Sequence, residues 1–327
     1  IYGSVEYYDS NTKALLLNVT VPSVTGYTTA LTNIGEVSNK GFEFQLTSRN
    51  IVGDFQWSTD LNFGSNQNEV LALGPQGDPL ISAGGAGQRH ITRIGDEVGS
   101  YYGYVVDGIY QSQDEIDNAP NDTQVGSGGA RPGDFRFKDV NGDGQITPDD
   151  RTVTGSYHPD FTYGITNRFA YKGLDLNVFI QGVQGREILN LTARHMRNGE
   201  ANFNSYAVLN DRWRSPQNPG NGDHPRADRL TGIHGNNNRP SSYQVEDGSY
   251  LRIKRLTLGY NLPNNLIGKY AQSVRVYGSA NNLAIFTDYT GFNPEVSLQA
   301  NSSLTPGEDY GAYPLSRTIQ LGIDISF

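Results

Sequence analysis

The stretch Arg317-Thr-Ile-Gln-Leu-Gly-Ile-Asp-Ile-Ser-Phe327 alternates apolar with polar or small residues along its whole length. The apolar residues occupy every second position, namely Ile319, Leu321, Ile323, Ile325 and Phe327. The positions between them hold Thr318, Gln320, Gly322, Asp324 and Ser326. Successive side chains point to opposite faces of a β-strand, whereas a helix would scatter these residues around its axis. The stretch therefore predicts a strand with one apolar and one polar face.

The same alternation recurs upstream in four further segments, which are 42–47, 55–63, 161–171 and 173–181. Tyr250–Tyr260 and Ser273–Thr287 alternate less regularly. In the first of these two, the apolar frame changes near Lys254 and Arg255, which predicts a β-bulge. With Ile1–Asp9 as the tail of one more strand, the pattern predicts about eight strands.

The connections between these segments alternate in length. Tight or medium turns are predicted at Asn50–Asp54, Ala170–Gly173 and Asn261–Gln272. Long polar stretches are predicted at 12–38, 71–159, 183–247 and 288–316. Short turns on one side and long extracellular loops on the other are typical of an outer-membrane β-barrel, whose strands of about 9–11 residues cross the bilayer. We expect Phe327 at the periplasmic rim.

Aromatic residues fall near both ends of the predicted strands. Those near the short turns are Trp57, Phe169, Tyr171, Tyr260 and Phe327, and those near the long loops are Phe161, Tyr163, Tyr250, Phe286 and Tyr289. Two such girdles hold amphipathic rings at the level of the lipid headgroups. The alternative is a soluble sandwich with aromatic core positions.

Composition excludes several classes of protein. The 327 residues include no cysteine, which rules out disulfides and zinc–thiolate sites, and carry a net charge of −9, which argues against a nucleic-acid partner. The five histidines show no HExxH spacing, and neither a phosphate-binding loop nor a GxSxG nucleophile elbow occurs. We therefore expect no enzymatic activity.

One segment has the spacing of a calcium-binding loop, residues 139–150, Asp-Val-Asn-Gly-Asp-Gly-Gln-Ile-Thr-Pro-Asp-Asp. The predicted ligands are Asp139, Asn141, Asp143, the carbonyl of Gln145, and Asp150 in place of the usual glutamate. Gly144 stands where the loop must turn sharply, and Thr147 with Pro148 predicts the start of a short helix. The alternative is an Asp/Asn/Gly turn without a metal. We expect a structural Ca²⁺ site in an extracellular loop.

Arginine is enriched in the second long stretch, at Arg186, Arg194, Arg197, Arg212, Arg214, Arg226, Arg229 and Arg239. Acidic residues of the same stretch are Glu187, Glu200, Asp211, Asp223 and Asp228. One interpretation is contact with an acidic partner or ligand. The favoured interpretation is local pairing, because the planar guanidinium group forms bidentate pairs that hold loops together.

An ordered series of motifs resembles the SusC/RagA-type TonB-dependent outer-membrane transporters. The series runs through residues 33–44, 133–144, 212–216, 224–226, 247–260, 280–283 and 291–295, which read NIGEVSNKGFEF, GDFRFKDVNGDG, RWRSP, HPR, DGSYLRIKRLTLGY, ANNL and GFNPE. The resemblance covers the chain from Asn33 to Phe327. It implies an all-β fold, an antiparallel transmembrane β-barrel of about 22 strands closed around a plug.

The resemblance also implies a function and a set of partners. Such a transporter is a nutrient importer in the outer membrane of a Gram-negative bacterium, coupled to TonB through its plug, and a SusD-like lipoprotein captures glycans or peptides for it. Residues 1–327 contain no plug and about a third of the strands, so we expect the C-terminal segment of the barrel, bordered by the remaining strands, the plug and outer-membrane lipid. The alternative function is a secreted, calcium-stabilised β-sandwich that binds a glycan or a protein.

Overall fold

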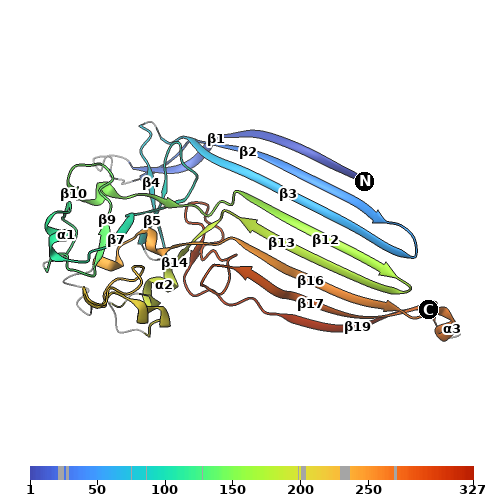
Figure 1. Ribbon diagram of the computed structural model, residues 1–327. Coiled ribbons are helices and arrows are strands. Elements are labelled where there is room, and N and C mark those ends of the chain that lie inside the picture. Colours follow the sequence, from blue (N-terminus) through green and yellow to red (C-terminus); the bar gives the residue numbers. More distant parts are fainter. Residues whose placement is uncertain are drawn as a thin grey trace.

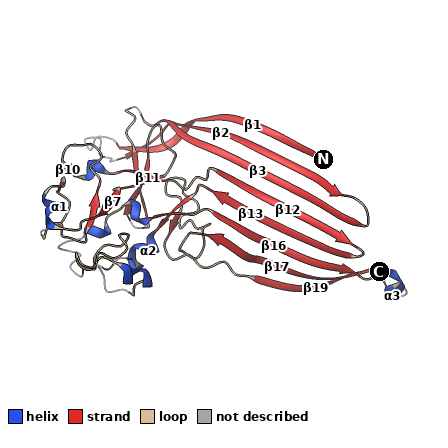
Figure 2. Cartoon of the chain, in the orientation of Figure 1, coloured by secondary structure: helices blue, strands red, loops and turns tan. Residues whose placement is uncertain are grey.

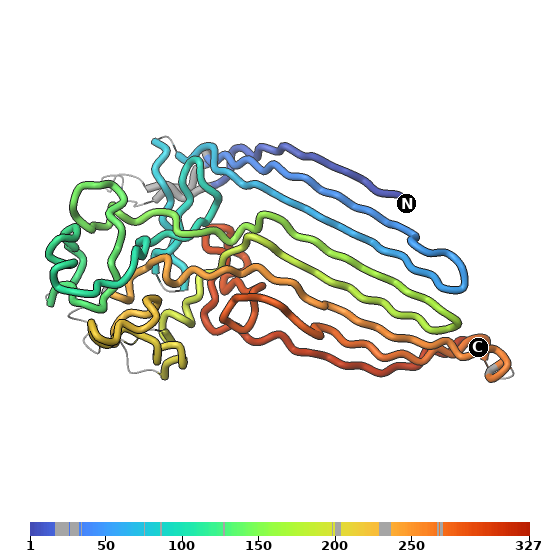
Figure 3. Tube along the Cα trace, viewed as in Figure 1, coloured from blue at the N-terminus to red at the C-terminus, as the bar shows by residue number. Residues whose placement is uncertain are grey.

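The computed structural model describes residues 1–327 except 21–25, 27–28, 75, 86, 127, 198, 200–203, 229–235 and 269–270. It has two parts, a long antiparallel sheet and a lobe at one end of it (Figure 1). The lobe consists of the three long segments that leave and re-enter the sheet, residues 73–160, 185–249 and 288–317. These segments lie side by side beyond the ends of the strands (Figure 3).

The sheet has eight strands in sequence order, each antiparallel to the next. They are β1 (Tyr2–Thr20), β2 (Thr29–Ile51), β3 (Phe55–Ala72), β12 (Phe161–Tyr171), β13 (Leu174–Gln184), β16 (Tyr250–Asn261), β17 (Ser273–Thr287) and β19 (Thr318–Ser326). The predicted strand number and order are confirmed. Among the described residues β1 pairs with β2 and β19 pairs with β17, so the sheet is open at both edges. The described strands therefore form an open sheet and not a closed barrel.

The prediction of a long loop at Thr12–Ser38 is wrong. Thr12–Thr20 and Thr29–Ser38 extend β1 and β2 and pair with each other. Register shifts around Leu15, next to Ala14 at φ 57°, interrupt the alternation of side chains there. Because such a bulge moves side chains to the other face, the period-2 signal breaks while the strand continues.

The predicted bulge in β16 is confirmed. The register shifts between Ile253 and Arg255 on the β17 side, and opposite this point on the β13 side. On β17 the bulge includes Asn282, which has φ 51°. Asparagine tolerates this left-handed conformation better than most residues. The shift keeps Leu251, Ile253, Leu256 and Leu258 on one face of the sheet.

The lobe holds the remaining strands and all but one of the described α-helices, and each is short (Figure 2). Its strands are β4 (Leu80–Gly84), β5 (Gly87–Thr92), β6 (Ser100–Gly103), β7 (Val106–Ile109), β8 (Asn121–Asp122), β9 (Phe135–Phe137), β10 (Gln145–Ile146), β11 (Thr152–Gly155), β14 (Glu187–Asn190), β15 (Val245–Asp247) and β18 (Glu308–Asp309). Its helices are α1 (Gln113–Asp117), α2 (Leu191–Met196) and the 3-10 helices η2 (Pro148–Asp150), η3 (Ala207–Asp211), η4 (Asn236–Asn238) and η5 (Ser242–Gln244). Helix α3 (Asn264–Ile267) lies in the turn between β16 and β17. The predicted short helix after Thr147 is η2.

Burial is concentrated in the lobe. One apolar cluster contains Tyr104, Ile109, Phe135, Phe137, Ile146 and Trp213, and two smaller clusters surround Leu191 and Ile188. The sheet, in contrast, leaves its apolar face open, and Leu321 on β19 is 89% exposed. A secreted β-sandwich would cover such a face with a second sheet. No helix among the described residues is long and apolar enough to cross a bilayer.

The turn between β12 and β13 generates a test of the fold. Lys172 has φ 46° and Gly173 has φ 86°, which matches a type I′ hairpin turn. Because asparagine adopts this conformation readily and a β-branched residue does not, Lys172→Asn should keep or raise stability. Lys172→Val should lower the free energy of unfolding by about 1–2 kcal/mol. Thermal unfolding followed by circular dichroism would measure both, and equal midpoints for the two variants would contradict the turn assignment.

Candidate functional site

The sheet separates charged from apolar side chains. Arg275 on β17 donates to Asp175 on β13 at 3.0 Å from Nε and 2.7 Å from Nη2, and its Nη1 lies 3.5 Å from Asp324 on β19. Ile323 and Ile325 flank Asp324 and point to the other face. The predicted face assignment of β19 is therefore confirmed.

The same polar face continues across β2, β3 and β12. Asp60 accepts a hydrogen bond from Thr47 Oγ1 at 2.7 Å and forms an ion pair with Arg168. Register places Asn62 and Asn177 on this face as well. We call this set of side chains the polar face.

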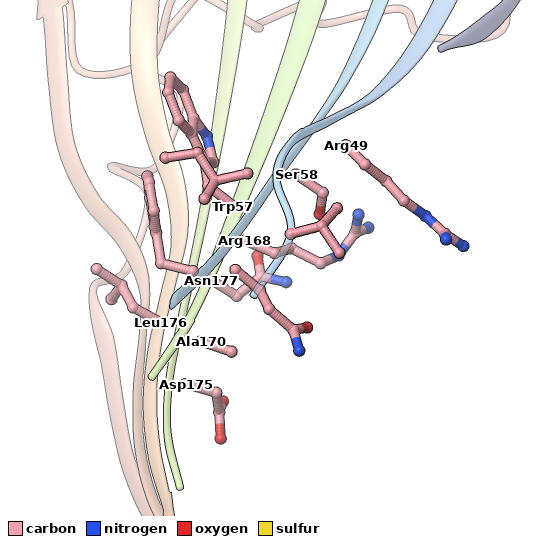
Figure 4. A pocket seen from close by; sticks show the side chains of 12 residues that line it. Arg49, Trp57, Ser58, Arg168, Ala170, Asp175, Leu176 and Asn177 are labelled. Atoms are coloured by element: carbon pink, nitrogen blue, oxygen red, sulfur yellow. The ribbon is translucent and has the colours of Figure 1, made fainter. Parts of the chain in front are cut away.

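A groove of about 610 Å³ lies on the strands near the tight turns (Figure 4). Trp57 and Leu176 project to one side of the strands, and Arg168, Asn177 and Asp175 project to the other. Its lining thus comes from both faces of the sheet. The groove is not an enclosed cavity and does not define a ligand site.

Aromatic rings gather on the apolar face near both ends of the strands. Trp57 stacks on Phe169 with ring centroids 5.8 Å apart, and Phe63 stacks on Phe161 at 5.4 Å. Two of the predicted girdle residues are assigned wrongly. Tyr250 and Tyr289 are each 5% exposed and pack inside the protein. Both hydroxyls donate to carboxylates of the segment 288–317, Tyr250 to Glu295 and Tyr289 to Asp309.

Where β16 leaves the lobe, the polar face of the sheet contacts the segment 288–317. Arg252 on β16 is 3% exposed and donates from Nη1 to Glu295 at 2.8 Å. Glu295 also accepts from Tyr250, which lies on the same face of β16. Because Arg252 is buried, loss of Glu295 would leave an uncompensated charge, so this contact ties the segment 288–317 to β16.

A second buried pair joins two lobe segments. His90 on β5 and Glu308 on β18 are both fully buried, with Nδ1 3.7 Å from Oε1. His90 Nε2 donates to the carbonyl of Pro306 at 3.1 Å, which leaves Nδ1 without a proton. Burial lowers the pKa of His90 to about 4 and raises that of Glu308. Burial therefore disfavours the charged form of each side chain, and His90 is neutral above about pH 4.

The predicted calcium loop has an ordered hydrogen-bond pattern. Asp139 accepts from Gly142 N at 2.7 Å and Gly144 N at 2.8 Å, and Asn141 and Asp143 accept from Asp143 N and Gln145 N. Gly142 and Gly144 have φ 76° and 80°. Side-chain oxygens and glycines thus fold the loop tightly.

Asp150 closes this loop from inside. It is fully buried, and its carboxylate accepts from Val140 N and Thr147 N, each at 2.8 Å. Although burial raises its pKa, these N–H donors hold the pKa of Asp150 below its usual value. Among the described residues, no three His, Asp or Glu side chains are grouped as a metal site requires. Calcium binding stays a prediction.

Local pairing within this stretch is confirmed for Arg197 and Arg226, whereas Arg239 pairs with a residue of another lobe segment. Arg226 pairs with Asp134 and Asp228, Arg197 with Glu246 and Arg239 with Asp122, each with one contact at 2.7 Å. Several partners come from other lobe segments, which the sequence pattern does not reveal. Arg229 and Glu200 lie outside the described residues.

Comparison with known proteins finds longer relatives, each of which matches this chain over about a third of its own length. TonB-dependent receptor P3 of Formosa agariphila is 41% identical over 335 residues, which cover 99% of this chain and 32% of that receptor. TonB-dependent receptor SusC of Bacteroides thetaiotaomicron is 27% identical over 340 residues, which cover 100% of this chain and 30% of SusC. No family model matches the sequence.

Solved structures share the fold. The RagAB peptide transporter superposes with a TM-score of 0.78 at 24% identity, over 99% of this chain and 33% of that one. The RagAB peptide importer in its open-open state gives 0.77 at 23% identity. The chain thus spans about a third of the length of the proteins it matches.

The buried pair of His90 and Glu308 makes the stability of the lobe depend on pH. Between pH 6.5 and about 4, the unfolded chain binds a proton at the histidine that the folded chain does not bind. The contribution of His90 to stability should therefore be lost as the pH is lowered through this window, while the raised pKa of Glu308 acts in the opposite direction. His90→Gln should reduce this loss, with Glu308→Gln as the matched variant that removes the opposing carboxyl group. Unfolding midpoints between pH 7 and 4 that change equally in the wild type and in His90→Gln would contradict the neutral state of His90.

Proposed function

Because the chain belongs to the SusC/RagA-type TonB-dependent receptors, of which it spans about a third, we propose that it forms part of the barrel wall of a nutrient importer. Receptors of this family sit in the outer membrane of Gram-negative bacteria and act as transporters, not as enzymes. We assign residues 1–327 to the C-terminal segment of the barrel, on the strength of the order of their motifs.

The observation that carries this proposal is the separation of the two faces of the sheet. One face is apolar and exposed, with Ile319 72% and Leu321 89% accessible, and the other bears ion pairs. Large exposed apolar surfaces mark contacts with a partner or a membrane. A strand that faces lipid on one side and a water-filled or plugged lumen on the other requires this division. The lobe then lies outside the cell, because long loops are extracellular in such barrels.

The two open edges of the sheet support a larger assembly. Eight strands closed on themselves would enclose little more than their own side chains. We propose that β1 and β19 pair with further strands of the same barrel, and that a polar plug, which TonB contacts, fills the lumen. A SusD-like lipoprotein would cover the lobe, and the transported material would be glycans or peptides; RagAB, which shares the fold, is a peptide importer.

Purification from the native host tests this function. The tagged chain should be found in the outer-membrane fraction, require detergent, and copurify with a plug-bearing polypeptide and a lipoprotein. A monomer that stays soluble in buffer without detergent would instead favour a secreted binding module.

Membrane insertion makes a prediction about two neighbouring residues of β19. Leu321→Arg places a charge on the apolar face and should cost about 2–4 kcal/mol near the middle of the bilayer. Gln320→Arg, the matched control, places the same charge on the polar face and should cost much less. Thermal unfolding in lipid bilayers would compare them, and similar losses for both variants would contradict the assignment of the faces.

We also propose that residues 139–150 bind Ca²⁺ as a structural ion through the side chains of Asp139, Asn141, Asp143 and Asp150 and the carbonyl of Gln145. The spacing of the oxygen ligands and the left-handed glycines at 142 and 144 support this proposal. The ion would offset the mutual repulsion of the carboxylates and hold the loop in shape.

Calorimetry can test the calcium site directly. Titration at millimolar Ca²⁺, the range of extracellular calcium modules, should give saturable binding. Asp139→Ala combined with Asp143→Ala should abolish it while the sheet remains folded, and Asp149→Ala, a neighbouring acid outside the ligand set, should leave it unchanged. If the intact protein did not bind Ca²⁺, the loop would be an Asp/Asn/Gly turn without a metal, and the proposal would be wrong.

A further inference from the structure

A hollow of about 650 Å³ opens on the lobe at the meeting point of three motifs. The motifs begin at Gly133, Arg212 and His224, so they come from segments far apart in the sequence. Four arginines line the hollow, namely Arg131, Arg212, Arg214 and Arg226. We call it the arginine hollow.

The wall of the arginine hollow is tightly packed. Trp213 is 7% exposed, belongs to the largest apolar cluster of the lobe, and donates from Nε1 to Gln111 at 3.1 Å. Gly133 has φ 94°, and a Cβ atom there would come within 2.3 Å of the Trp213 ring and 2.8 Å of Arg226 Cβ. The wall is therefore packed core, not a loosely placed loop.

Arg226 is neutralised inside this wall. Its Nε lies 2.7 Å from Asp134, which is 1% exposed, and its Nη2 lies 2.7 Å from Asp228. Its backbone N–H donates to the carbonyl of Gly133 at 2.8 Å. Arg226 thus holds two motifs together and leaves no positive charge for a ligand.

The other three arginines keep their charge. Arg212 donates to the carbonyl of Leu209 at 2.8 Å and Arg214 to that of Asn210 at 3.0 Å, and a carbonyl carries no net charge. Arg131 is exposed at the rim. In the part of the chain that the structure describes, none of the three guanidinium groups lies within 4.0 Å of a carboxylate. This concentration of positive charge stands on a chain whose net charge is −9.

We propose that the arginine hollow binds a ligand that carries two or more carboxylate groups. Planar guanidinium groups match carboxylates in bidentate geometry, and three of them suit a ligand with repeated acidic groups. Pro132, Pro216 and the edge of Trp213 offer apolar surface between the charges. The acidic groups come either from a sugar acid chain or from an acidic peptide. This binding does not depend on transport, so it can be measured on the purified receptor that contains the chain.

The chain contains two tryptophans, Trp57 and Trp213, which gives a direct optical test. The conservative variant Trp57→Phe leaves Trp213 as the sole tryptophan of residues 1–327, at the wall of the hollow. Titration of this detergent-solubilised variant with trigalacturonate or triglutamate should give a saturable change in fluorescence that weakens with added salt. Maltotriose and trialanine, which have no acidic side groups, should give none. The acid that responds identifies the source of the carboxylates.

Variants of the arginines connect this signal to the hollow. Arg131→Gln, and Arg212→Gln with Arg214→Gln, should each weaken binding about tenfold, the usual effect of losing a hydrogen bond to a charged group. Arg93→Gln is the matched control, because Arg93 pairs with Asp96 at 2.6 Å elsewhere on the lobe and should not change binding. Arg131 makes no side-chain contact that folding needs, so its variant stays informative if the double variant does not fold. No response to either acid at about 1 mM, or equal affinity of the Arg131→Gln variant and its parent, would overturn the proposal.

Discussion

The ion pairs of Arg275 with Asp175 and Asp324 join three strands of the sheet, and they can form in one register alone. A slip of one residue would turn Asp324 to the apolar face and Ile323 toward the charges, because side chains alternate strictly along a strand. The hydrophobic pattern and the charge pairs therefore specify the same alignment. The separation of faces, the exposed apolar surface and the proposed position in a membrane all depend on this register.

The lobe is stabilised by interactions of a different kind from those of the sheet. Its strands are short, and its three segments support each other through small apolar clusters and ion pairs such as Arg226 with the buried Asp134. Arginine suits such contacts, because the N–H groups of its guanidinium donate to a carboxylate while its flat face packs on aromatic rings. Arg239, for example, pairs with Asp122 and lies over the rings of Tyr104 and Phe137. Where the described residues offer no such partner, as at Arg212 and Arg214, the charge is available to an external ligand.

The sequence predicted those strands and irregularities that depend only on residues close together in the chain. Alternation identified β12, β13 and β19, and the frame change at Lys254 located the bulge. It did not predict the parts of β1 and β2 that lie within 12–38, where a bulge next to Ala14 breaks the alternation. It also placed Tyr250 and Tyr289 in a girdle, because alternation does not reveal their carboxylate partners, Glu295 and Asp309, which lie 45 and 20 residues further along the chain. The arginine hollow joins residues from 131 to 226, and no periodic pattern can bring such residues together.

The absence of cysteine allows the central claim, that one face of the sheet meets lipid and the other does not, to be measured residue by residue. Single cysteines introduced one at a time from Thr318 to Ser326 would carry a spin label. In lipid bilayers, collisions with oxygen, which concentrates in lipid, and with a water-soluble nickel chelate report which side each label faces. The account predicts that positions 319, 321, 323 and 325 favour oxygen, and that 320, 322 and 324 are protected from it, with period 2. Uniform access of the nickel chelate along β19, or an inverted pattern with Asp324 on the lipid side, would contradict it.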